Sequence, residues 1–98
     1  MITDLETSGL HDKSLSWDDP SQPWIVSAAA MLLTYDGTIF NHFHFHVDAN
    51  GRKIKPGAEK VHGISSRHAS LYGISEVVVL GALCGFARQA VTVASFGK

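Results

Sequence analysis

Residues 24–47 read WIVSAAAMLLTYDGTIFNHFHFHV, and this stretch decides the fold. Residues 24–33 are almost continuously apolar, which is typical of a strand buried on both faces. Asp36-Gly37 then separates two apolar segments, and this dipeptide is the strongest short-range signal of a hairpin. The expected type I′ turn needs a positive φ at both of its central residues. The stretch therefore predicts two antiparallel strands joined by a tight turn.

The second strand of this hairpin, expected over residues 39–47, alternates strictly between two kinds of side chain. Three apolar residues share one face and three histidines share the other: Phe43, Phe45 and Val47 against His42, His44 and His46. A strand of this kind is half exposed and suits the edge of a sheet. A His-x-His pair on a strand is also a known arrangement for zinc, so a zinc site remains an alternative to a solvated face.

Weaker signals predict the other elements. Residues 11–23 are a polar loop, and the polar, glycine-bearing stretch over residues 48–57 indicates another. Ser75 is a suitable N-cap for a helix over residues 76–89. Four apolar residues recur there at helical spacing: Val79, Leu83, Phe86 and Ala90. Residues 91–94 then predict a short buried strand.

Composition limits the kind of protein. With 98 residues and 45% hydrophobic content, the chain suits one small globular domain. No apolar run approaches the roughly 20 residues that a membrane helix needs, so we expect no membrane partner. Cys84 is the only cysteine, and its apolar surroundings predict a buried thiol in a reducing, cytoplasmic compartment. A formal charge of −1 predicts that any contact with nucleic acid is local.

Candidate chemistry begins with two acidic residues near the start of the chain, in a strand candidate over residues 1–6. Asp4 and Glu6 are two positions apart, so their carboxylates point to the same face, about 6.6 Å apart along the strand. Carboxylate oxygens are the ligands that Mg²⁺ and Mn²⁺ prefer. The pair therefore suits a divalent metal site, although two solvated acids at the end of a strand are the more ordinary interpretation of Asp-x-Glu alone.

Three segments carry a family resemblance. Residues 4–10, DLETSGL, closely resemble the first motif of the DEDD (DnaQ-like) 3′–5′ exonucleases, an Asp-x-Glu-Thr-(Thr/Ser)-Gly-Leu run. Residues 54–58 and 61–64, IKPGA and VHGI, resemble the family's loop before its first main helix. Residues 93–98, VASFGK, are similar to the approach to the family's second motif. These segments follow one another in the family's order.

The chain also departs from the family. Ser95 and Phe96 replace a usual His-Asn pair, and Ser27 and Ala29 replace the usual Glu and Gly of the second strand. The second-motif aspartate and the third motif, with its general-base His or Tyr and last aspartate, would lie beyond the final residue. The resemblance implies an α/β, ribonuclease-H-like mixed sheet in strand order 3-2-1-4 with helices. We expect residues 1–98 to be a single partial exonuclease domain with its C-terminal part missing.

The resemblance implies a metal-dependent enzyme that hydrolyses terminal phosphodiesters of DNA or RNA to nucleoside 5′-monophosphates. Asp4 and Glu6 would be catalytic, with Asp4 bridging two Mg²⁺ or Mn²⁺ ions and Glu6 binding one of them. Five residues would hold the terminal nucleotide of a single-stranded or frayed 3′ end: Thr7, Gly9, Leu10, Val61 and His62. The chain alone would be inactive, because two of the four metal-binding acids are absent. The alternative is an inactive module that binds a nucleic-acid end or a polymerase.

Overall fold

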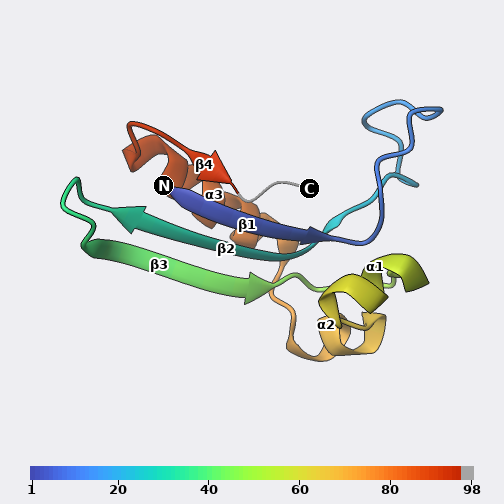
Figure 1. The fold of residues 1–98 in the computed structure, drawn as a ribbon. Helices are drawn as coiled ribbons and strands as arrows, with labels where there is room; N and C mark the ends of the chain where they lie inside the picture. Colours follow the sequence, from blue (N-terminus) through green and yellow to red (C-terminus); the bar gives the residue numbers. More distant parts are fainter. Residues whose placement is uncertain (96–98) are drawn as a thin grey trace.

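The computed structural model describes residues 1–95, which form a four-stranded mixed sheet and three helices (Figure 1). The strands are β1 (Ile2–Thr7), β2 (Ile25–Leu33), β3 (Ile39–His46) and β4 (Ala94–Ser95). The helices are α1 (Pro56–His62), α2 (Ser66–Tyr72) and α3 (Glu76–Gln89). The sheet has the order β3-β2-β1-β4, with β1 antiparallel to β2 and parallel to β4. The predicted α/β class and strand order are confirmed.

The predicted hairpin is present as β2 and β3, but its predicted turn type is wrong. The Gly37 N–H donates to the Thr34 carbonyl at 3.0 Å, and the Thr34 N–H donates to the Thr38 carbonyl at 2.9 Å. Gly37 has a φ of 88°, whereas among residues 1–95 only Asn50 is a non-glycine residue with a positive φ. The loop is therefore one residue longer than a type I′ turn, with glycine in the left-handed position. Hydrogen bonds from Thr34 and Thr38 lower the pKa of the Asp36 carboxyl to about 2.

The sheet has two faces of different character, because successive residues of a strand point in opposite directions. The closed face is the side that packs against α3 and consists of Val26, Ala28, Ala30, Phe43 and Phe45. The open face is the other side and carries Asp4, Glu6, Ser27, His44 and His46. Burial on both faces, predicted for residues 24–33, is therefore wrong. Only the closed-face residues of β2 are consistently buried, since the open face includes partly exposed Ala29 and Met31.

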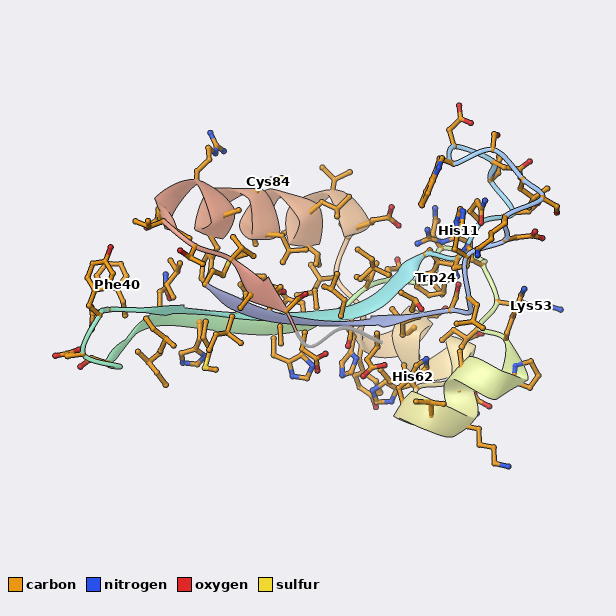
Figure 2. The ribbon with its side chains drawn as sticks, turned by 45° about the horizontal axis from the view of Figure 1, so that its top comes forward. His11, Trp24, Phe40, Lys53, His62 and Cys84 are labelled. Carbon is orange, nitrogen blue, oxygen red and sulfur yellow. The ribbon has the colours of Figure 1, made fainter. Side chains whose placement is uncertain are left out.

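Helix α3 covers the closed face, as Figure 2 shows. Its predicted bounds are confirmed, with Val79 fully buried and the Phe86 ring edge-on to Phe43 at 4.9 Å between centroids, while Ala90 follows the helix as its C-cap. The alanines of β2 let the helix approach closely. Ser75 is at the N-cap, but its side chain makes no capping hydrogen bond. The predicted burial of Cys84 is wrong, because this residue lies on an exposed part of the helix.

Helix α1 begins within the loop predicted over residues 48–57, and α2 lies where no element was predicted. Pro56 begins α1, where its missing N–H costs nothing, and Gly63 ends the helix with a φ of 73°. Ser65 caps α2 by accepting a hydrogen bond from the His68 N–H at 3.0 Å. The strand expected over residues 91–94 is also wrong, because only Ala94 and Ser95 pair with β1 and residues 91–95 are exposed.

Two further expectations concern Phe96 and the absence of a membrane span. Phe96, which stands where the family has asparagine, lies outside the described residues. Within residues 1–95, none of the helices is long and apolar enough to cross a lipid bilayer.

Candidate active site

A cavity of about 960 Å³ lies at the end of β1 and brings together segments from distant parts of the chain. It is lined by most of the residues that the sequence predicted to form the site: Glu6, Thr7, Gly9, Leu10, Val61 and His62. Asp4 is the exception, because it is not among the lining residues. Figure 2 shows His11 and His62 on opposite sides of the strand ends, where the 11–23 loop and α1 lie.

Buried Ser8 fixes the turn that follows β1. Its N–H donates to the Trp24 carbonyl and its hydroxyl accepts from the Trp24 N–H, both at 3.0 Å. Its carbonyl accepts from the Lys55 N–H at 2.9 Å. The turn is therefore attached both to the residue that precedes β2 and to the residue that precedes α1. This explains why the motif that ends β1 and the segment that carries His62 share one cavity.

His62 connects α1 directly to the end of β1. Its Nδ1 accepts a hydrogen bond from the Ile64 N–H at 3.0 Å, so the ring hydrogen of the neutral form lies on Nε2. Nε2 is 3.1 Å from the Thr7 carbonyl oxygen and donates to it. Both ring nitrogens are thus used to hold the two segments together. In this geometry His62 acts as a positioning residue for the turn and also lines the cavity.

Asp4 and Glu6 share the open face, as predicted from their spacing. Asp4 is exposed and Glu6 is half-buried. The strand register aligns Asp4 with Ala29 and His44, and Glu6 with Ser27 and His46. Small residues of β2 therefore separate each acid from a histidine of β3.

Carboxylates of this kind fit a hard divalent cation in donor chemistry. However, no group of three or more His, Cys, Asp or Glu side chains within residues 1–95 is arranged to hold a metal ion. Asp4 and Glu6 thus fit Mg²⁺ or Mn²⁺ as part of a ligand set.

The three histidines expected on one strand face do not assemble into a zinc site within the described residues. His44 and His46 lie 5.3 Å apart between ring centroids, and His46 lies 5.1 Å from His68 of α2. The Nδ1 of His46 is buried without a hydrogen-bond partner. Burial, followed by the nearby His44 and His68, lowers the pKa of His46. These rings join β3 to α2, and their arrangement offers no support for the zinc alternative.

Several residues that line the cavity were not predicted from the sequence. His11 and Trp17 of the 11–23 loop and Lys55 before α1 line it together with the predicted residues. Trp17 is the one large aromatic residue of the polar 11–23 loop, which is the only signal that the sequence offers for this part of the cavity. Lys55 carries no comparable signal.

A comparison with protein-family models found no match to this chain, and a search of curated proteins found none either. The function of the chain is therefore inferred from the residues that line the cavity.

Proposed function

We propose that this chain belongs to a metal-dependent 3′–5′ exonuclease domain of the DEDD type, with a ribonuclease-H-like sheet. The substrate is the 3′ end of DNA or RNA, and the product is a nucleoside 5′-monophosphate. One observation carries the proposal: the two motifs that resemble the family, at the end of β1 and in α1, line a single cavity. They are connected by the hydrogen bond between His62 and the Thr7 carbonyl, across 55 positions of sequence.

The walls of the cavity suit a nucleotide. Its volume of about 960 Å³ is within the usual range for small-molecule sites. Leu10 and Val61 line it with side chains that are 88% and 68% exposed, so both are apolar surfaces available to a base or sugar. Glu6 supplies the acidic end of the same cavity. Apolar walls with a few convergent polar groups are typical of a binding site for a small organic ligand.

Asp4 and Glu6 would hold the metal ions beside this cavity. When bound, two divalent ions supply an activated water and stabilise the leaving oxygen. The two carboxylates carry two negative charges, whereas two divalent ions carry four positive charges. Substrate phosphate and further ligands must therefore complete the site. The turn after β1, held by Ser8 and His62, would keep the terminal nucleotide in register with the two acids.

Binding of Mn²⁺ and thymidine 5′-monophosphate tests this proposal. Mn²⁺ should broaden the NMR signals of Asp4, Glu6 and Thr7, and the added nucleotide should shift those of Val61 and His62. The double variant Asp4→Asn/Glu6→Gln should lose the broadening, whereas Asp18→Asn, a control in the 11–23 loop, should keep it. Broadening that persists in the double variant would contradict the proposed metal site.

Activity gives a second test. In any form of the protein that releases nucleotides from a 3′-labelled oligonucleotide with Mn²⁺, Asp4→Ala or Glu6→Ala should lower the rate by about 10³-fold or more. The fold should survive, because neither acid belongs to the buried core. Unchanged release in either variant would remove the basis of the assignment.

A non-catalytic module that binds nucleic-acid ends or a polymerase is the second candidate. It is favoured by the lack of a group of three metal ligands within residues 1–95. Such a module would bind a single-stranded 3′ end equally well with and without Mn²⁺. It would do so in the Asp4→Asn/Glu6→Gln variant too.

A further inference from the structure

An exposed aromatic pair stands at the rim of the cavity. The rings of His11 and Trp17 stack at 3.9 Å between centroids, with an angle of 18° between their planes. Trp17 is nevertheless 83% exposed. Both residues line the cavity that holds Leu10, Val61 and His62. The stacked pair therefore presents a flat, exposed aromatic surface to the cavity.

The loop that carries this pair is held together by its own side chains. The Gln22 amide donates to the carbonyls of Asp12 and Ser16 at 2.8 and 3.1 Å, and its oxygen accepts from the Asp12 N–H at 3.0 Å. The Asp12 carboxylate accepts from the Ser14 N–H at 2.9 Å. These bonds make residues 11–23 a compact surface loop. The aromatic pair is therefore built in advance of binding, which lowers the entropy cost of ordering it.

Positive charge lies next to the aromatic pair. A smaller cavity of about 220 Å³ shares Gln22, Pro23 and Lys55 with the large one and is also lined by Arg52 and Lys53. Arg52 is engaged, because it pairs with Glu76 at 2.7 Å and lies over the Trp24 ring. Lys53 and Lys55 are exposed. In Figure 2, His11, Trp24, Lys53 and His62 all lie around the same end of the sheet.

We propose that the His11–Trp17 stack is a platform for the nucleobase next to the terminal nucleotide of a single-stranded 3′ end. This inference rests on the proposed function, because the terminal nucleotide is assigned to the cavity beside the platform. Lys53 and Lys55 supply charge that complements the phosphates of the same strand. Aromatic side chains bind bases of single strands because every base has a π face, whichever its sequence. A base within a duplex has its faces covered by its neighbours, so the platform selects unpaired ends.

Fluorescence anisotropy of a short thymidine oligonucleotide, labelled at its 5′ end, tests the platform. Ca²⁺ replaces Mn²⁺ so that the ligand is not hydrolysed, and thymidine 5′-monophosphate is measured by competition. Trp17→Ala should weaken oligonucleotide binding about tenfold and leave the mononucleotide unchanged. Trp17→Phe should recover most of the loss, and Gln22→Ala should weaken oligonucleotide binding less than Trp17→Ala. Tyr35→Ala is the matched control, since Tyr35 is 98% exposed in the hairpin turn at the other end of the sheet.

Each outcome separates the platform from the exonuclease proposal. Equal weakening of both ligands, no weakening of the oligonucleotide, or equal binding of a blunt duplex would overturn the platform. If Trp17→Ala weakens oligonucleotide binding while Asp4→Asn/Glu6→Gln changes neither binding nor Mn²⁺ broadening, the platform stands and the exonuclease proposal fails. If Mn²⁺ and the mononucleotide bind as proposed but Trp17→Ala changes nothing, the platform fails alone.

Discussion

The two faces of the sheet share the same strands but differ in what they contact. On the closed face, Ala28 and Phe43 lie under α3 and exclude water. On the open face, Asp4, Ala29 and His44 align across β1, β2 and β3, and all three are exposed or half-buried. The difference shows that stability and proposed chemistry come from alternate residues of one strand. Substitutions on the two faces should therefore have different consequences.

The largest expected difference in unfolding free energy is between two variants, one with an aspartate on the closed face and one with an aspartate on the open face. Ala28→Asp puts a carboxylate at a fully buried position under α3 and should cost about 3 kcal/mol or more of unfolding free energy. Ala29→Asp, its neighbour on the open face, should cost about 1 kcal/mol or less, mainly through repulsion by Asp4 across the strand pair. Urea denaturation of both variants measures the difference. Equal costs would mean that the closed face is not the core.

A smaller loss is expected where α2 joins the edge of the sheet. A Cβ on Gly73 would overlap the Ala69 carbonyl oxygen and backbone atoms of Val47 and Asp48. Because backbone cannot yield as a side chain can, Gly73→Ala should cost about 2–3 kcal/mol. Gly57→Ala is the matched control, since its Cβ would meet nothing within 4 Å. Thermal unfolding of the two variants should separate them clearly, and similar melting temperatures would show that α2 moves freely.

Acid should lower the free energy of unfolding through His46, which lies on the open face. The groups that face it are His44 on the same strand, His68 on α2, and Glu6 across Ser27. Burial lowers the pKa of His46 below its ordinary 6.5, so the unfolded chain binds a proton more readily than the folded chain. This contribution to stability is present above pH 6.5 and is lost as the pH falls through the lowered pKa.

Denaturation at about pH 7.5 and about pH 5.5 should therefore show a loss that His46→Gln reduces. His42→Gln is the control, because His42 lies on the same strand face but is exposed. If the loss of stability is unchanged in His46→Gln but smaller in His42→Gln, the pH dependence comes from His42 and the prediction for His46 is wrong.

The smallest effect should be a gain, on the side of α3 that faces away from the sheet. Gly81 is exposed, and an added Cβ would meet nothing within 4 Å. Gly81→Ala should raise the unfolding free energy by about 0.5–1 kcal/mol through helix propensity alone. Circular dichroism during thermal unfolding measures it. A decrease would indicate that this side of the helix is packed against something.

Sequence patterns with a short period predicted their elements well. The alternation of β3 and the helical spacing of α3 were both confirmed. Helices α1 and α2, of seven residues each, were missed. Helices this short are marginal by themselves and form because tertiary contacts hold them. Pro56 and Gly57 were therefore expected in a loop, although Pro56 begins α1.

The residues of the candidate site were likewise predicted only in part from local sequence patterns. The shared face of Asp4 and Glu6 follows from strand geometry, whereas the predicted residues that line the cavity with Glu6 came from a family resemblance. His11, Trp17 and Lys55 were not predicted, because the path of the 11–23 loop depends on Gln22 reaching back to Asp12 and Ser16. No local pattern encodes that path.

By itself, the sequence determined which side chains share a face, since the period of two along a strand is a property of the backbone. Only the tertiary structure decided which face α3 covers and that Thr7 meets His62 across 55 positions. Such contacts depend on closing long loops and on which packing buries most apolar surface, and both are properties of the whole chain. Ser8 shows the difference: it reads as an ordinary turn residue, yet its buried hydrogen bonds to Trp24 and Lys55 hold the candidate site together.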